Sequence, residues 1–264
     1  RRMFAAIADR YDLLNCLLSF RRDRAWRNFA ISNSGVRPGG LALDVATGTA
    51  ELARHLARQS GAGTIIGIDF CPDMLARARA KLANSPGGGR IELVLGDALR
   101  LPFPDNTFDC VTIGFALRNV ASTAHAFGEM ARVVKPGGRV ISLELTRPSS
   151  SLVRAIYYVY LRRIAPYIGG LISGRREAYT YLPESILEFP SPEDVKEIMR
   201  GAGLQKVGIY RLTLGAATVH VGSKGGGPDV GSRRSSNPDR CRSKADLALT
   251  TNKKGPGTDA SHTI

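Results

Sequence analysis

Three aspartates follow short apolar runs in the first hundred residues. Asp44 lies in LALDV, Asp69 follows IIGI and Asp97 follows ELVLG. If these runs are parallel strands, their carboxyl ends meet at one edge of a sheet, where α/β proteins bind ligands. Asp69 lies 25 residues after Asp44, about the spacing at which a carboxylate accepts hydrogen bonds from both hydroxyls of a ribose. A single aspartate would more often cap the following helix, but three in succession favour a shared nucleoside site.

The turn after Asp44 narrows the kind of nucleoside. A dinucleotide site needs the pattern G-x-G-x-x-G, which holds a pyrophosphate at the amino end of a helix. The corresponding turn here, ATGTA, contains a single glycine, Gly48. The chain also has no G-x-x-x-x-G-K-[ST] loop, the pattern that binds the phosphates of a nucleotide. Small residues at 48–50 let a ligand approach the backbone closely. These features favour a nucleoside without a pyrophosphate.

Strands and helices alternate up to residue 145. Apolar runs predict a strand that begins at Leu41 and further strands at Thr64–Ile68, Ile91–Leu95, Phe108–Phe115 and Arg139–Leu145. Helical spacing of apolar residues is found in an N-terminal segment, 3–32, and then at Glu51–Gln59, Pro72 to about Asn84, and Thr123–Val134. This alternation predicts an α/β fold with a doubly wound, mostly parallel Rossmann-like sheet.

The later part of the chain predicts a helical insert and two more strands. We expect a helix at Ser151–Tyr167, a tyrosine-rich loop at Tyr179–Pro190 and a helix at Pro192–Ala202. The runs Gln205–Leu212 and Ala216–Gly222 are joined by a short glycine turn, which is typical of an antiparallel hairpin. The hairpin at the sheet edge would bring the sheet to seven strands.

Composition divides the chain into three parts. We expect an N-terminal helical lid at 1–35, the main domain at 36–223 with an insert at about 150–190, and a disordered basic tail at 224–264. The tail is rich in Gly, Ser and Pro and carries eight Lys and Arg against four Asp, and it has too few apolar residues to offset the entropy of ordering. The formal charge of +14 is compatible with nucleic acid, an anionic membrane or an anionic cofactor, and does not choose among them.

Several kinds of site are not expected. The four cysteines form no C-x-x-C pair and the four histidines have no metal-ligand spacing, so we predict reduced thiols and no metal. No apolar run is long enough for a transmembrane helix, and the first residues run into charge too soon for a signal peptide.

The motifs resemble those of a known family. DVATGTAE, IGIDF, GDALRLPFPDNTFDCVTIGFALRNV and EMARVVKPGGRVISLELTRP resemble the S-adenosylmethionine-dependent class I methyltransferases. YDLLNCLLSFRRDRAW and YTYLPESILEFPSPED are similar to the signatures of the menaquinone/ubiquinone biosynthesis C-methyltransferases. The resemblance covers about residues 3–222 and implies S-adenosylmethionine as the cofactor.

The resemblance also implies which residues bind the cofactor. Asp69 would accept from the ribose hydroxyls and Asp97 from the adenine amino group. The resemblance also places the cofactor against Thr49, Ala98 and Gly114, and the first strand and its turn add Asp44 and Gly48 as candidates. The chain departs from the family pattern at Ala50, where glycine is common, at Glu51, where aspartate is common, and at Gly114, where serine occurs. Ala50 would cost about 1 kcal/mol or more if its φ were positive.

The reaction that the resemblance implies is methyl transfer to a ring carbon of a polyprenyl quinol, from demethylmenaquinol to menaquinol. A ring carbon is a weak nucleophile until a ring hydroxyl loses or shares its proton. Arg118 would favour an anionic oxygen and Asn119 would orient it, while Tyr11 and Asp12 would fold over as part of the lid. Arg118 could instead form a surface ion pair, and Tyr11 could pack the lid.

The insert suggests where the lipid tail binds. Ile156, Tyr157, Tyr160, Leu161 and Ile164 have helical spacing beside Arg162 and Arg163, a pattern compatible with an amphipathic surface on anionic lipid, although core packing or a homodimer face is the more usual meaning. We expect a cytoplasmic protein with peripheral contact at the inner membrane face and no nucleic-acid partner. Benzoquinol methylation, methylation of another small molecule, and a non-catalytic relative that binds the cofactor or RNA remain alternatives.

Overall fold

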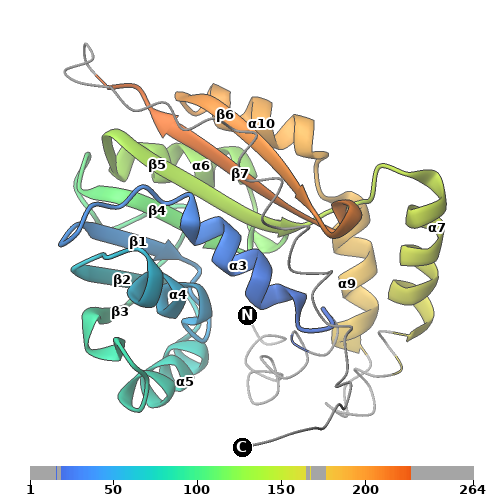
Figure 1. Cartoon of the computed structure of the whole chain (residues 1–264), viewed down its shortest axis with the longest axis horizontal. Coiled ribbons are helices and arrows are strands. Elements are labelled where there is room, and N and C mark those ends of the chain that lie inside the picture. The colour runs from blue at the N-terminus through green and yellow to red at the C-terminus, as the bar shows by residue number, and fades with distance from the viewer. Residues whose placement is uncertain (1–15, 17–18, 165–166, 168–176, 227–264) are drawn as a thin grey trace, which may run out of the picture. The chain divides into compact units, whose positions relative to one another are not determined.

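Seven strands form one sheet in the computed structural model, which describes residue 16, residues 19–164, residue 167 and residues 177–226 (Figure 1). All of these belong to one unit, Arg1–Gly227. The spatial order is β3-β2-β1-β4-β5-β7-β6. The strands are β1 (Leu41–Val45), β2 (Thr64–Asp69), β3 (Ile91–Leu95), β4 (Phe108–Gly114), β5 (Val134–Leu145), β6 (Leu204–Leu212) and β7 (Ala217–Lys224).

The pairings confirm the predicted fold class. Strand β1 lies parallel to β2 and β4, so Asp44 is opposite Gly67 on one side and Thr112 on the other. Strands β2 with β3 and β4 with β5 are also parallel, whereas β7 is antiparallel to both β5 and β6. The five parallel strands therefore direct their carboxyl ends to the same edge.

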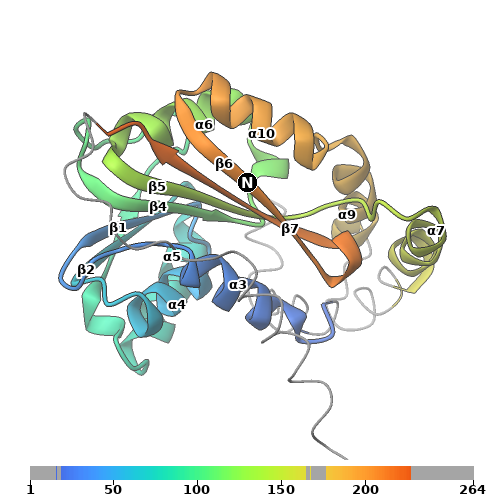
Figure 2. The same ribbon diagram turned by 45° about the horizontal axis from the view of Figure 1, so that its top comes forward.

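Helices cover both faces of the sheet (Figure 2). One face carries α3 (Arg22–Ser32), α4 (Glu51–Gln59) and α5 (Pro72–Ala83), and the other carries α6 (Thr123–Val133) and α10 (Pro192–Gly201). Each face has its own buried core. Trp26 and Leu56 contribute to the first core, and Phe127 and Met199 to the second. Strands buried on both faces explain the near-continuous apolar runs in the sequence.

The predicted tyrosine-rich loop at 179–190 is wrong, because this stretch forms α9 (Glu177–Glu188). Pro183 lies inside the helix, and proline in a helix interior removes a backbone hydrogen bond. Pro183, Ile186 and Phe189 are nevertheless buried at steps of three, while Glu184 and Glu188 are exposed. The burial of these side chains in the folded protein therefore stabilises a helix at a place where proline, by its local preference, predicts none.

Three other expectations concern the insert and the ends of the chain. The insert is helical, as α7 (Ser151–Val159) followed by a π-helical turn, Tyr160–Ile164. Of the segment expected to form the helical lid, residue 16 and residues 19–35 are described and contain α3, whereas Tyr11 and Asp12 lie outside the described residues. The expected tail at 224–264 also lies outside them except for its first three residues. Lys224 itself belongs to β7, and its Nζ donates to the carbonyl oxygens of Arg132 and Val134 at 3.0 Å.

None of the described helices is both long enough and apolar enough to span a bilayer.

Candidate active site

A cavity of about 250 Å³ opens at the carboxyl ends of β1, β2, β3 and β4. Its walls are largely apolar. Residues that line it include Gly48, Asp69, Phe70, Cys71, Met74, Asp97, Ala98, Leu99, Gly114, Phe115, Asn119 and Val120. Six of the ten predicted site residues are brought together here: Gly48, Asp69, Asp97, Ala98, Gly114 and Asn119.

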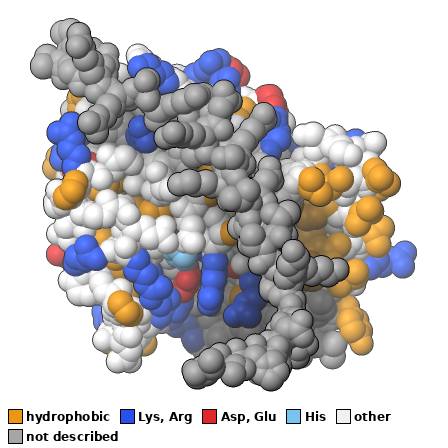
Figure 3. Space-filling model, viewed as in Figure 1, with side chains coloured by type: hydrophobic (Ala, Val, Ile, Leu, Met, Phe, Trp, Pro, Cys, Tyr) orange, Lys and Arg blue, Asp and Glu red, His pale blue; other side chains and the backbone are white. Residues whose placement is uncertain are grey.

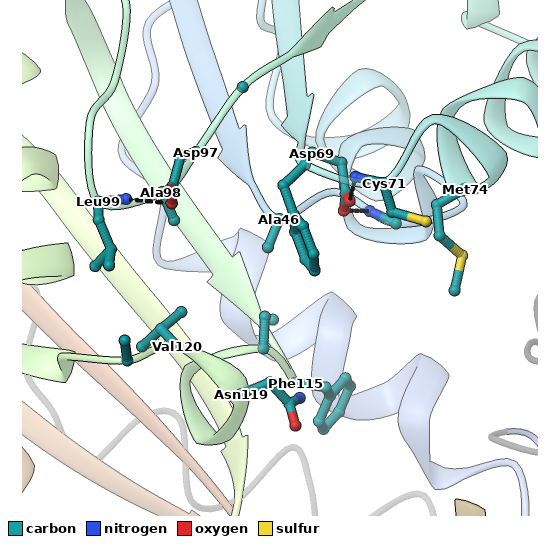
Figure 4. Close-up of a pocket in the computed structure, with 16 residues that line it drawn as sticks. Ala46, Asp69, Cys71, Met74, Asp97, Ala98, Leu99, Phe115, Asn119 and Val120 are labelled. Carbon is teal, nitrogen blue, oxygen red and sulfur yellow. Dashed lines mark hydrogen bonds between the residues drawn. The ribbon is translucent and has the colours of Figure 1, made fainter. Parts of the chain in front are cut away.

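Asp69 ends β2 and reaches the cavity with only 6% of its surface exposed. Its Oδ2 accepts the backbone N–H of Gly48 at 2.8 Å and its Oδ1 that of Cys71 at 2.9 Å (Figure 4). Burial raises the pKa of Asp69 above its ordinary value, although the backbone donors oppose this shift. A buried carboxylate that still faces a cavity gains from further donors. The two hydroxyls of a ribose would supply them.

Asp97 and Ala98 lie beyond the end of β3, on the same side of the cavity as Asp69 (Figure 4). The Oδ1 of Asp97 accepts the backbone N–H of Leu99 at 2.9 Å. Its other oxygen has capacity for an amino group such as that of adenine. Asn119 and Phe115 lie across from the two aspartates, so the cavity has acidic groups on one side and an amide on the other.

The turn between β1 and α4 has an unusual backbone. Ala46, Gly48 and Ala50 all have positive φ, of 51°, 56° and 63°. Ala50, the residue before α4, therefore carries the strain expected of an alanine in the left-handed region. Gly48 faces the cavity, whereas Thr49 is buried and does not line it.

Asp44 lies beneath this turn and not in the cavity wall. Its Oδ2 accepts the hydroxyl of Thr47 at 2.7 Å and its Oδ1 that of Thr112 at 2.8 Å. Complete burial raises the pKa of Asp44 to about 6, despite these hydrogen bonds. Asp44 thus links Thr47 of the turn to Thr112 of β4. Because it does not line the cavity, it affects a ligand only by fixing the conformation of the turn.

Arg118 follows β4 but turns away from the cavity. It forms an ion pair with Glu144, at the end of β5, and the two side chains are only 6% and 1% exposed. The predicted alternative of a surface ion pair is therefore wrong in one respect, since the pair is buried. Arg118 also lies close enough to Tyr157 of α7 for its charge to act on that phenol, whose pKa burial raises far above its usual range.

Glycine at position 114 fits its surroundings. A Cβ at Gly114 would lie 3.1 Å from Cδ2 of Leu52, which is tighter than an ordinary van der Waals contact. Leu52 belongs to α4, so the close approach of this helix to the end of β4 leaves little room for the side chain of a serine at position 114.

Sequence reasoning missed several residues of the site. Phe70, Cys71 and Met74 follow the end of β2 and line the cavity beside Asp69, and apolar residues there match a flat ring next to a ribose. Glu144 was missed as well, although a carboxylate in the apolar run VISLEL was a visible signal. In the described part of the chain, no group of three or more His, Cys, Asp or Glu could hold a metal ion.

Similar proteins match over nearly the whole described chain. A model of the ubiE/COQ5 methyltransferase family matches residues 1–224. The chain is 47% identical to the ubiquinone/menaquinone biosynthesis C-methyltransferase UbiE of Geobacter sulfurreducens, over 85% of this chain and 88% of the relative. It is 46% identical to the demethylmenaquinone methyltransferase of Thermus thermophilus, over 84% of this chain and 100% of the relative.

Solved structures support the fold. A SAM-dependent methyltransferase from Aquifex aeolicus superposes with a TM-score of 0.54 at 20% sequence identity, over 74% of this chain and 88% of that one. These matches confirm the expected enzyme class, a C-methyltransferase of quinone biosynthesis that uses S-adenosylmethionine. The chain belongs to the ubiE/COQ5 methyltransferase family.

Proposed function

We propose that the protein methylates a ring carbon of demethylmenaquinol and so forms menaquinol. The observation that carries the proposal is the largely apolar cavity at the strand ends, with the buried carboxylate of Asp69 facing it. The identity of 46% to a relative named demethylmenaquinone methyltransferase supports the naphthoquinol as the acceptor.

The cofactor residues in this proposal have distinct tasks. Asp69 accepts hydrogen bonds from the ribose, Asp97 and Ala98 flank the adenine, and Gly48 and Gly114 leave room for the methionine end. Thr49 and Asp44 shape the turn that Gly48 belongs to. S-adenosylmethionine supplies the electrophilic methyl group when it is bound; the chain itself supplies alignment and exclusion of water.

Activation of the acceptor falls to residues at the end of β4. Asn119 is the polar side chain of this segment that lines the cavity, so it orients the ring oxygen. Arg118 does not line the cavity and is paired with Glu144, so it would act on the acceptor only by holding the segment that carries Asn119. Tyr11, from the N-terminal segment, stays part of the proposal as a residue of the lid over the ring.

We also propose that α7 is the face that meets the membrane, where the quinol dissolves. Leu152, Ile156 and Val159 lie one or two turns apart and are 70%, 64% and 60% exposed. Figure 3 shows hydrophobic side chains gathered on this side of the molecule, with basic side chains beside them. The segment 151–164 contains Arg154, Arg162 and Arg163 and no acidic residue, a charge that suits anionic lipid.

This apolar face differs from the one that the sequence suggested. Of the predicted stripe, Leu161 is buried and Tyr157 and Tyr160 are half-buried, whereas Ile156 and Ile164 are exposed. Leu152 and Val159, which the stripe did not include, are also exposed. A homodimer through the same face stays a prediction.

The test is methyl transfer measured by mass spectrometry with two acceptors, a demethylmenaquinol and the corresponding benzoquinol, each with a prenyl tail. We expect methylation of the naphthoquinol. Methylation of the benzoquinol alone would move the assignment to ubiquinone biosynthesis. If neither is methylated while calorimetry detects S-adenosylmethionine binding, the acceptor is wrong; if RNA binds and the cofactor does not, the enzyme assignment itself is wrong.

A further inference from the structure

Arg27 is a buried cation in α3 with few partners. Its side chain is 8% exposed, and its Nε lies 3.8 Å from Oδ2 of Asp23, which is longer than a hydrogen bond. Within the described residues, the buried Nε has no hydrogen-bond partner. A guanidinium has five N–H donors, and burying such donors unpaired is costly. The structure therefore leaves room for an acceptor at Arg27.

The guanidinium lies next to the wall of the cavity. Its Cζ is 5.0 Å from the ring centre of Phe115, and Nη1 is 4.0 Å from the point where a Cβ on Gly114 would lie. Both Gly114 and Phe115 line the cavity. Arg27 also acts electrostatically on Asp44 and Glu51, which flank the turn at 46–50. The positive charge thus lies at the end of the cavity formed by this turn.

The carboxylates near Arg27 already have other partners. Glu51 accepts from Arg54 at 2.7 Å and from Lys81 at 2.8 Å. Burial would raise the pKa of Glu51, but these cations, with Arg27, bring it down to about 2.

The other two acids are also engaged. Asp44 is held by two threonine hydroxyls, and Asp23 accepts the hydroxyl of Ser19 at 3.0 Å. Stacking on Phe115 contributes a cation–π attraction but offers no acceptor to the N–H groups.

We propose that Arg27 binds the carboxylate of the methionine moiety of S-adenosylmethionine. The inference rests on the proposed placement of the cofactor, with the ribose on Asp69 and the methionine end at the turn. A guanidinium can hold a carboxylate through two parallel hydrogen bonds, and one of them can use the buried Nε–H that the described residues leave without a partner. Arg27 would then connect α3 to the cofactor.

The test compares two ligands that differ in this group alone, S-adenosylmethionine and decarboxylated S-adenosylmethionine, by titration calorimetry. In Arg27→Gln we expect the affinity for S-adenosylmethionine to fall about tenfold to a hundredfold, the range for a charged hydrogen bond. The affinity for the decarboxylated ligand should stay within about twofold of that of the unaltered protein. Arg24→Gln, an exposed arginine on the same helix, is the matched control and should change neither affinity.

The outcomes separate this proposal from the one it rests on. Asp69→Asn should weaken both ligands equally, because both carry the ribose. If Arg27→Gln also weakens both equally, Arg27 acts by packing on Phe115 and the inference is wrong. If the unaltered protein binds neither ligand, the cofactor placement fails first. Should Arg27→Gln not fold, Arg27→Lys carries the same comparison, with a smaller loss for the carboxylated ligand alone.

Discussion

Replacing Asp44 by asparagine should change how the stability of the protein depends on pH. Asparagine keeps the shape, and its Oδ1 can accept the hydroxyl of Thr47. Its amide can donate to Oγ1 of Thr112, because that hydroxyl lies 3.3 Å from the carbonyl of Leu43 and can donate there instead. The substitution therefore removes the charge and retains the hydrogen-bonding positions.

The magnitude follows from the pKa of Asp44, which burial raises from 3.8 to about 6. Since the folded pKa is the higher one, the contribution of this group is fully present below pH 3.8 and is lost as pH rises through about 6. At 1.36 kcal/mol per unit, the whole loss is about 3 kcal/mol, and on the order of 1.5 kcal/mol of it falls between about pH 5 and pH 8. Asparagine has no such loss.

Urea unfolding of both proteins at about pH 5 and pH 8 measures the effect. We expect the free energy of unfolding of Asp44→Asn, relative to the unaltered protein, to rise by about 1.5 kcal/mol from the lower pH to the higher. Other titrating groups cancel in this difference. Asp73→Asn, at an exposed position in the first turn of α5, is the control for the chemical change itself. A difference that is the same at both pH values would refute the reasoning.

Three further substitutions test separate features. Ala50→Gly relieves about 1–2 kcal/mol of left-handed strain, but it loses a buried methyl group and raises the entropy of the unfolded chain, and each of these costs about 0.8 kcal/mol. Thermal unfolding should therefore show a net change in stability below about 1 kcal/mol, and a larger change would contradict the strain argument. Arg132→Met removes the donors to the carbonyls of Leu101 and Phe103, and hydrogen exchange should quicken over 99–107 and not over α4. Ile156→Glu should reduce sedimentation with anionic vesicles, whereas Leu95→Glu, at a position 57% exposed on β3, should not; equal losses would exclude α7 as the membrane face.

The strand ends and helix starts could be predicted because they depend on local patterns. The helix Glu51–Gln59 was predicted with its observed bounds, and the strand ends placed Asp69 and Asp97 at the right edge of the sheet. Sequence position gives the edge but not the direction of a side chain, and for this reason Asp44, inside β1 and not at its end, was grouped with the other two. The roles of Arg27 and Glu144 depend on burial between distant elements, which no local pattern reports.

The position of β7 has a consequence for the order in which the chain can fold. This strand is the last in sequence among those described, yet it lies between β5 and β6. Strand β6 pairs with β7 alone, so it has no place in the sheet until β7 is available. During synthesis, the parallel strands that form the cavity can assemble before residue 204 is made, whereas β5 keeps an unpaired edge until Lys224 has emerged.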